Sequence, residues 1–152
     1  MVEVGQPAPE FALKDQNNQV VSLADFRGAK NVLLVFYPYA FTRVCGGELD
    51  AIRDALPDFE NDATQIVTVS VDTPYANRVW GTREGYTFPM LSDFWPHGAV
   101  AQAYGCFSEE RGCATRGTFV IDRSGVVRWK VVNDVPDARD LDEYRAALAA
   151  LA

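Results

Sequence analysis

The sequence predicts a layered α/β domain with a central sheet that is mixed but mostly parallel and is flanked by helices. Three observations predict this fold class. Residues 31–37 and 65–71 are continuous apolar runs rich in strand formers, which is typical of strands buried on both faces of a sheet. Each run is followed by a segment in which apolar residues recur with helical spacing. A late pair of strand-like segments, joined by a short turn containing glycine, adds an antiparallel hairpin.

The elements of the amino-terminal half follow from these patterns. A short strand is expected at residues 20–23, before the first buried strand. Pro38 ends that buried strand, because proline has no N–H to donate to a neighbouring strand. From residue 42 to residue 56 the pattern changes to a helix, whose apolar stripe consists of Leu49, Ile52 and Leu56.

The carboxyl-terminal half continues the alternation of helices and strands. Residues 74–85 begin with proline and end with glycine, as helices often do. The elements expected after this helix are a strand at 88–93, a short helix at 98–105, the hairpin strands at 117–122 and 126–132, and a final helix at 141–151. Ligands of such sheets bind at the carboxyl ends of the strands, beside the starts of helices.

Length and composition indicate one folded unit. The chain has 152 residues, of which 48% are hydrophobic and 23% are charged, close to the average of globular proteins. A chain of this length buries a substantial core but leaves little room for a second domain. Because no repeat, low-complexity run or flexible linker interrupts the sequence, we expect a single domain over residues 1–152.

Charge and hydropathy exclude several classes of partner. The formal net charge of -7 disfavours binding to nucleic acid or to an anionic membrane surface. No basic start followed by an apolar run opens the chain, and no window approaches the roughly 20 apolar residues of a membrane span. The expected location is therefore the cytoplasm. The three cysteines and one histidine lack a C-x-x-C pair, so we expect neither a disulfide framework nor a metal, and no cofactor is indicated.

Cys45 is the leading candidate for chemistry. The thiolate is the reactive form of cysteine, but a free thiol with a pKa of about 8.5 is mostly protonated at neutral pH. The first turn of the helix beginning at Thr42 places unpaired N–H groups and the positive end of the helix dipole near the sulfur. Thr42 lies one helical turn before Cys45, and Pro38 shapes the loop. Arg116 is a better source of positive charge than Arg43, which is expected to point to solvent.

These residues resemble the active site of peroxiredoxins. Pro38, Thr42 and Cys45 match the family motif P-x-x-x-T-x-x-C, and Glu48 matches the acidic residue that usually follows. The resemblance implies that Pro38, Val44 and Glu48 line the substrate pocket. Arg116, before the segment "GTFVID", matches the arginine that the family places at the same site. The similarity extends over nearly the whole chain and is strongest to the one-cysteine AhpE-type group.

The resemblance implies a thioredoxin-like fold with an amino-terminal hairpin, and an antioxidant, thiol-dependent peroxidase. Cys45 would attack hydrogen peroxide, an organic hydroperoxide or peroxynitrite and become a sulfenic acid. Thr42, Arg116 and the backbone N–H groups of Val44 and Cys45 would hold the peroxide oxygens. The implied partners are a thiol reductant (thioredoxin, mycoredoxin or a low-molecular-weight thiol) and a second copy of the chain, as a homodimer or larger assembly.

The sequence leaves the fate of the sulfenic acid open. Cys106 and Cys113 do not occupy the positions used by known resolving cysteines, and the simpler interpretation is that both are small buried apolar residues. A two-cysteine mechanism with either thiol as the resolving residue is the alternative. A peroxide sensor that uses Cys45 without rapid turnover is another. A dithiol oxidoreductase is disfavoured, because Glu48 stands where C-x-x-C requires a second cysteine.

Overall fold

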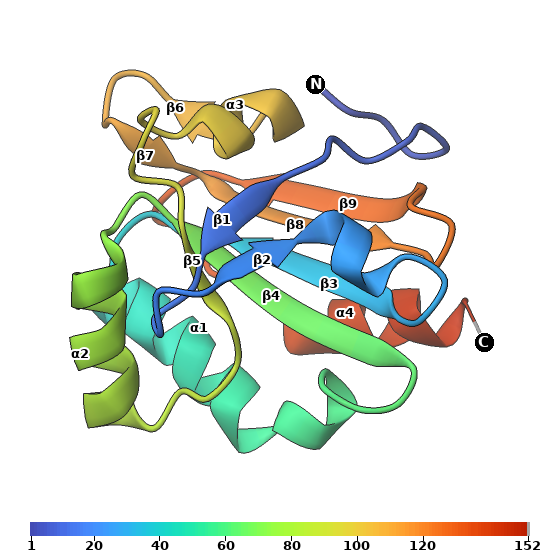
Figure 1. The fold of residues 1–152 in the computed structure, drawn as a ribbon, viewed down its shortest axis with the longest axis horizontal. Coiled ribbons are helices and arrows are strands. Elements are labelled where there is room, and N and C mark those ends of the chain that lie inside the picture. The colour runs from blue at the N-terminus through green and yellow to red at the C-terminus, as the bar shows by residue number, and fades with distance from the viewer. Residues whose placement is uncertain (152) are drawn as a thin grey trace.

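The computed structural model describes residues 1–151, which fold around a seven-stranded sheet (Figure 1). The strand order is β2-β1-β5-β4-β3-β8-β9. These strands are β1 (Ala12–Lys14), β2 (Val20–Ser22), β3 (Asn31–Phe36), β4 (Thr64–Ser70), β5 (Met90–Ser92), β8 (Arg116–Ile121) and β9 (Val127–Asn133). A separate small hairpin, which the sequence patterns did not predict, consists of β6 (Phe107–Ser108) and β7 (Cys113–Ala114).

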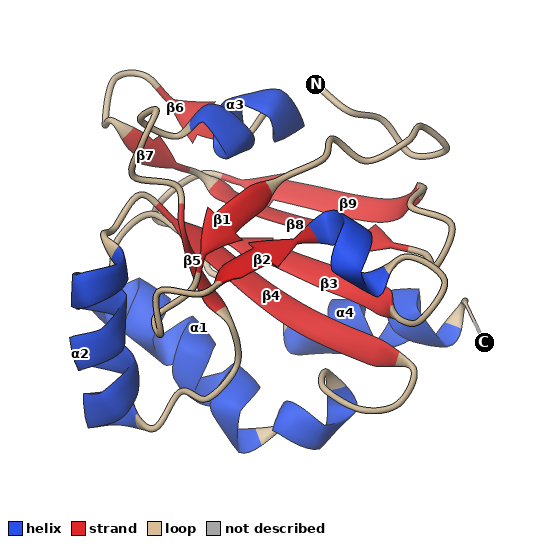
Figure 2. Ribbon diagram, in the orientation of Figure 1, coloured by secondary structure: helices blue, strands red, loops and turns tan. Residues whose placement is uncertain are grey.

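Helices cover the sheet on both faces (Figure 2). They are α1 (Arg43–Asp54), α2 (Pro74–Glu84), α3 (Ala99–Tyr104) and α4 (Leu141–Ala149), with 3₁₀ turns η1 (Leu23–Phe26) and η2 (Leu56–Asp58). The predicted helices are confirmed, although α4 ends two residues earlier than expected. The ends of α2 have clear causes: the Thr73 hydroxyl accepts a hydrogen bond from the Ala76 N–H (3.2 Å), and Gly85 takes the left-handed conformation that terminates the helix.

The sheet is mixed, as predicted, but the expectation that it is mostly parallel is wrong. Only β3, β4 and β5 are parallel neighbours. Four strand pairs are antiparallel: β3 with β8, β8 with β9, β1 with β2, and β1 with β5. Burial explains the error. β8 is buried along its whole length, which is typical of parallel strands, but burial does not determine the direction in which a strand runs. The predicted amino-terminal and carboxyl-terminal hairpins are both present.

Two apolar cores lie on opposite faces of the sheet. Successive side chains of β3 alternate between them, because strand side chains point to opposite faces. One core contains Val32, Leu34 and Phe36, and the other contains Leu33, Val35 and Tyr37. The first core is closed by the amino-terminal segment and α3, and the second by α1, α2 and α4. This double burial explains why the segment is continuously apolar.

The loops that follow β3 and β4 are tied together at the carboxyl edge of the sheet. The Ala40 N–H donates to the carboxylate of Asp72 (2.8 Å), and the Ser70 hydroxyl donates to the same oxygen (2.7 Å). These bonds hold the segment between β3 and α1 against the end of β4. The start of α1 is thereby fixed at the sheet edge where the sequence placed the candidate site. No helix in the described part of the chain is long and apolar enough to cross a membrane.

Candidate active site

A constrained turn leads into α1 and positions Cys45. Phe41 has a φ of 63°, which a bulky L-residue rarely adopts, and Thr42 then returns to an extended conformation as the N-cap. Within α1, the first N–H bonded to a helix carbonyl is that of Gly46, which donates to Thr42 (2.8 Å). The N–H groups of Val44 and Cys45 precede this ladder, so they are directed toward the open end of the helix.

A cavity of about 250 Å³ opens at this helix start. It is bordered by five of the residues that the sequence singled out: Pro38, Thr42, Val44, Cys45 and Arg116. Arg43 also borders it, and Tyr39, Arg111, Val135 and Pro136, which were not predicted, complete its wall. The Cys45 side chain is almost wholly buried at the base of the cavity. The volume suits a small substrate that reaches the sulfur from one side.

Arg116 joins the cysteine to a buried acid. Its Nη1 lies 3.4 Å from the Cys45 Sγ and 2.6 Å from the Glu48 Oε1, and its Nε donates to the Val135 carbonyl (2.5 Å). Only 2% of Arg116 is exposed. A fixed positive charge therefore stands beside the sulfur in surroundings that screen it little. This placement agrees with the role expected for Arg116.

Glu48 is the centre of an ion-pair network with two arginines. Arg139 donates from Nη2 to Oε1 (2.8 Å), and from both Nε (3.0 Å) and its backbone N–H (2.8 Å) to Oε2. Burial acts to raise the pKa of Glu48, but the hydrogen bonds and charges of Arg139, followed by the charge of Arg116, hold it below the ordinary value. Glu48 is therefore an ionised group that holds Arg116. The expectation that it lines the substrate pocket is wrong, because its carboxylate is turned to the two arginines and it does not border the cavity.

Arg139 is the member of this network that the sequence did not indicate. Besides Glu48, its Nη1 reaches the carbonyls of Phe36 (2.7 Å) and Gly117 (2.9 Å) and the Thr118 hydroxyl (3.0 Å). It thus links the loop before α4 to both β3 and β8. Its neighbours in the chain, "VPDARD", are polar and turn-forming, which predicts a surface position. No local pattern marks this arginine as buried, because its acidic partner lies in α1.

The hydrogen bond of Thr42 decides what its hydroxyl can do in the cavity. Its hydroxyl donates to the Tyr39 carbonyl (2.8 Å) and not to the sulfur of Cys45, which lies one turn further along α1. With its hydrogen committed, the hydroxyl oxygen borders the cavity as an acceptor. Arg43 is exposed, as expected, at the cavity rim.

The other two cysteines are buried free thiols in different surroundings. Cys106 belongs to the apolar core opposite α1, where it packs so closely on Gly117 that a Cβ added there would lie 2.9 Å from its own. Burial raises the pKa of the Cys106 thiol far above its ordinary value. Cys113 lies in the β6–β7 hairpin, where burial raises the pKa of its thiol while the neighbouring Tyr39 and Arg111 act to lower it. The structure thus separates two residues that the sequence could not distinguish.

Together, the buried thiol, the adjacent guanidinium and the small cavity on a thioredoxin-like sheet define a thiol-dependent peroxidase. Comparison with known proteins agrees. Residues 4–130 match the AhpC/TSA family model. The chain belongs to this family, a family of peroxiredoxins.

Individual relatives extend the similarity over the whole chain. The chain is 56% identical over 151 residues to alkyl hydroperoxide reductase E of Mycobacterium tuberculosis, covering 99% of both chains. It is 39% identical to a thioredoxin peroxidase of Echinococcus granulosus, covering 92% of this chain and 76% of the relative. Among solved structures, peroxidoxin BcpB from Mycobacterium tuberculosis superposes with a TM-score of 0.85 at 27% identity, covering 100% and 99% of the two chains. A reduced 2-Cys peroxiredoxin of Plasmodium vivax gives 0.88 at 29%, covering 99% and 82%.

Proposed function

We propose that the protein reduces hydrogen peroxide and organic hydroperoxides at Cys45, with peroxynitrite as a further substrate. The observation that carries this proposal is the 3.4 Å contact between the Cys45 Sγ and the Arg116 Nη1 at the base of a small cavity. The thiolate attacks the terminal peroxide oxygen, the O–O bond breaks, and the leaving oxygen takes up a proton to give water or an alcohol. Cys45 is left as a sulfenic acid.

Each group that surrounds the Cys45 sulfur has a separate role in this reaction. The Thr42 oxygen accepts a hydrogen bond from the terminal O–H of the peroxide and orients it toward the sulfur. Arg116 and the N–H groups of Val44 and Cys45 stabilise the negative charge that develops on the departing oxygen. Pro38 limits the space beside the sulfur and offers no N–H that would bind water.

Glu48 and Arg139 act indirectly, as positioning residues. Glu48 receives Arg116 Nη1 at 2.6 Å, and Arg139 holds Glu48 by three hydrogen bonds. We propose that this network fixes the direction of the Arg116 guanidinium before substrate binds. Preorganised charge of this kind needs no rearrangement during the reaction.

The catalytic cycle closes with an external thiol. Thioredoxin, mycoredoxin and a low-molecular-weight thiol are the candidate reductants, and each would return Cys45 to the thiol state. The cytoplasm, where such reductants are maintained, is the proposed location. The three free cysteines of the structure are compatible with a reducing compartment.

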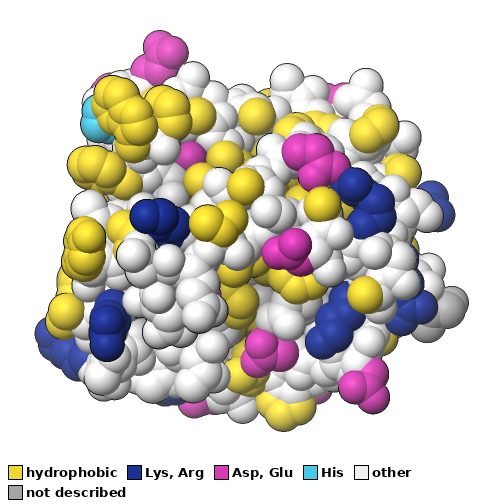
Figure 3. Space-filling view, in the orientation of Figure 1, with side chains coloured by type: hydrophobic (Ala, Val, Ile, Leu, Met, Phe, Trp, Pro, Cys, Tyr) yellow, Lys and Arg dark blue, Asp and Glu magenta, His cyan; other side chains and the backbone are white. Residues whose placement is uncertain are grey.

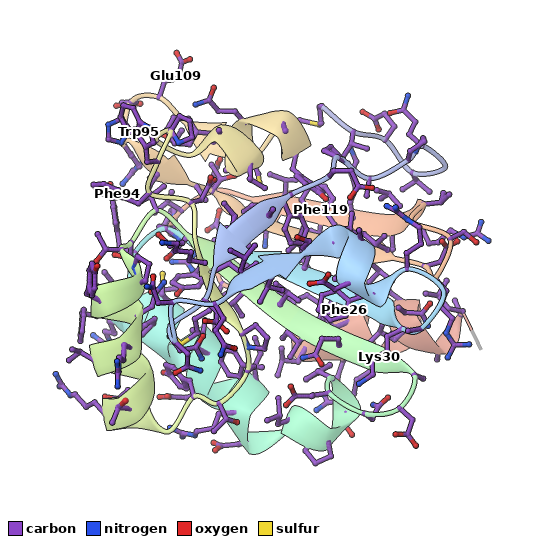
Figure 4. The ribbon with its side chains drawn as sticks, viewed as in Figure 1. Phe26, Lys30, Phe94, Trp95, Glu109 and Phe119 are labelled. Carbon is purple, nitrogen blue, oxygen red and sulfur yellow. The ribbon has the colours of Figure 1, made fainter. Side chains whose placement is uncertain are left out.

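We further propose that the chain works as a homodimer or larger assembly. Large hydrophobic side chains are exposed near the site, on the adjoining loops and on α2, namely Tyr39, Phe41, Val44, Tyr75, Val79, Phe94 and Trp95. Figure 3 shows apolar side chains gathered along one edge beside the single histidine, and Figure 4 labels Phe94 and Trp95 there. Burial of this edge between copies would stabilise the assembly. Sedimentation of the wild-type chain and of Trp95→Glu tests this, since the variant should sediment as a smaller species.

The peroxidase proposal is tested by hydroperoxide consumption with dithiothreitol as the recycling thiol. The wild-type chain and Cys106→Ala, which keeps the site intact, should consume hydrogen peroxide and cumene hydroperoxide catalytically. Cys45→Ser should not exceed the rate of dithiothreitol alone. Equal consumption by Cys45→Ser and wild type would refute the proposal.

A further inference from the structure

Among the described residues, the wall of the active-site cavity carries three arginines and no acidic residue. Arg116 lies beside the Cys45 sulfur, and Arg43 and Arg111 border the same cavity from two other segments of the chain. Apart from Cys45, the other residues that border it are uncharged. The chain as a whole has 21 acidic and 14 basic residues. Positive charge is therefore concentrated at this cavity against the overall charge of the protein.

The three arginines differ in burial and in pairing. Arg116 is buried and paired with Glu48 at 2.6 Å, so its charge belongs to the base of the site. Arg43 and Arg111 are exposed, at the mouth of the cavity. Within residues 1–151, neither of these two guanidinium groups forms an ion pair with a carboxylate. Their charges are therefore available to a ligand.

Hydrogen bonds fix the backbone of Arg111 at the mouth of the cavity. Its N–H donates to the Ser108 hydroxyl (3.2 Å), and its carbonyl accepts from the Tyr39 hydroxyl (2.6 Å). The N–H of Gly112 donates to the Ser108 carbonyl (2.8 Å) and closes the turn between β6 and β7. Because Tyr39 also borders the cavity, its bond to Arg111 joins two segments of the wall. The point from which the Arg111 side chain extends is thus defined by the site.

The place of Arg43 in α1 is unfavourable for the helix itself. Arg43 is the first residue of α1, and residues 43–46, which form the first turn, contain no acidic residue. The start of a helix carries partial positive charge, so an acidic side chain stabilises it and a basic one does not. Local costs of this kind are typical of functional sites. Here the arginine adds a full positive charge to the helix start at the cavity.

The acidic residues of the adjoining loops do not cancel this charge. These residues are Glu109, Glu110, Asp134 and Asp137. In the part of the chain that the structure describes, none of them borders the cavity or pairs with an arginine. Figure 4 shows Glu109 projecting away from the sheet. The mouth of the cavity therefore keeps its positive charge.

We propose that Arg43 and Arg111 bind a negatively charged group of the substrate, so that the protein prefers hydroperoxides that carry a carboxylate. The proposal rests on the proposed function, since Cys45 must first react with hydroperoxides. A guanidinium binds a carboxylate through paired, charge-assisted hydrogen bonds. Apolar wall residues such as Val44 and Pro136 suit the hydrocarbon part of such a molecule. The peroxide reaches the Cys45 sulfur, while the carboxylate stays at the mouth of the cavity.

The same two charges also speed the encounter with an anionic substrate. An exposed charge attracts an anion over about 10 Å at 0.1 M ionic strength. Charges at the rim of a binding site mainly change the rate of association and its dependence on salt. The preference for the anion should therefore weaken as salt is added, whereas the rate with an uncharged hydroperoxide should change little.

The test compares two hydroperoxides of nearly the same shape and different charge. One is cumene hydroperoxide with a carboxylate at the para position of its ring, and the other is the methyl ester of that compound. The rate of Cys45 oxidation in a single turnover at low salt is measured for each, and the charge preference is the ratio of the two rates. Arg43→Gln and Arg111→Gln should each lower this ratio about threefold, and the double variant about tenfold, the lower end of electrostatic steering.

The matched control is Arg123→Gln. Arg123 is an exposed arginine in the turn between β8 and β9, at the far end of β8 from Arg116. The substitution makes the same change of net charge without touching the cavity, and it should leave the ratio unchanged. Arg111→Glu, which places a negative charge at the mouth, should lower the ratio further than Arg111→Gln.

The outcomes separate this proposal from the function on which it rests. A wild-type ratio of one or less, or an unchanged ratio in the double variant, would overturn the role of the two arginines and leave the peroxidase intact. An equal fall in the rates with both compounds would also overturn it, because the arginines would then support the site in general. Failure of the wild-type chain to react with either compound would instead refute the proposed function.

Discussion

The two faces of the sheet bury a cysteine each, in opposite chemical surroundings. On the face covered by α3, Cys106 is enclosed by apolar side chains of β3, β8 and the amino-terminal segment. On the face covered by α1, Cys45 touches the apolar core and also the guanidinium of Arg116, with the Glu48–Arg139 pair behind it. The same residue type is packing material on one face and the proposed nucleophile on the other.

The difference shows that burial alone does not decide what a thiol does. Both side chains are about 1% exposed. What distinguishes them is a fixed positive charge at 3.4 Å and a cavity that opens on the sulfur, present only on the α1 face. Maintaining buried charge there requires three ionic side chains arranged with nearly complete hydrogen bonding.

The largest effect is expected from breaking the charged network. Glu48→Ala leaves the guanidinium groups of Arg116 and Arg139 buried without a counter-charge, and should lower the free energy of unfolding by about 3–5 kcal/mol. Urea denaturation of the variant and the wild type measures this. Glu48→Gln keeps the shape and some hydrogen bonds and should fall between them. An unchanged stability in Glu48→Ala would show that the network is not structurally important.

The next effect concerns rate. Arg116→Met fills similar space without charge and should slow the reaction of Cys45 with hydrogen peroxide by about 10²–10³-fold, the usual cost of losing one donor to a developing oxyanion. Single-turnover kinetics on the folded fraction measures it. Arg116→Lys, which keeps the charge but loses the fork of donors, should recover part of the rate. A rate within twofold of wild type in Arg116→Met would remove the arginine from the mechanism.

A smaller effect is expected on the apolar face. Cys106→Ser buries a hydroxyl among apolar side chains and should cost about 1–3 kcal/mol of stability. Cys106→Ala should be better tolerated, because it removes the sulfur without adding a polar group. Both should keep the peroxidase rate of the wild type once folded. A rate defect in a folded Cys106→Ala protein would contradict the division between the two faces.

The smallest effect is a change in the acid dependence of stability. Because the folded state lowers the pKa of Glu48, its stabilising contribution is present above the ordinary value of 4.5 and is lost as pH falls through the folded value. One such proton adds at most about 1.4 kcal/mol per pH unit to the slope. Unfolding curves between pH 7 and acid should therefore be flatter for Glu48→Gln than for the wild type. Parallel curves would argue against an ionised Glu48.

The sequence was informative where chemistry is local and uninformative where it depends on long-range contacts. Pro38, Thr42 and Cys45 are neighbours on one loop and helix, so their spacing predicts one wall of the site. Arg116 was identified only through its family context, because nothing near it in the chain marks a distant cysteine as its partner. The buried position of Arg139 could not be predicted, since its acidic partner is 91 residues away.

The direction of strand β8 could not be predicted from the sequence for a related reason. β8 is buried along its length, as β3 is, and burial on both faces is equally consistent with parallel or antiparallel pairing. Its direction follows from the path of the chain through α3 and the β6–β7 hairpin. That hairpin has only two residues per strand, too few to show a period, although its loop carries Arg111 to the cavity.

The most direct test compares the oxidation of Cys45 and of Cys106, the two thiols buried on opposite faces of the sheet, within one molecule. The reduced wild-type chain is exposed briefly to less than one equivalent of hydrogen peroxide, quenched with an alkylating agent, and digested with trypsin. We predict that oxidation is confined to the peptide of Cys45 and that the peptide of Cys106 stays fully reduced. Comparable oxidation of Cys45 and Cys106 would contradict the claim that the charged network and the cavity, and not exposure or burial, make Cys45 reactive.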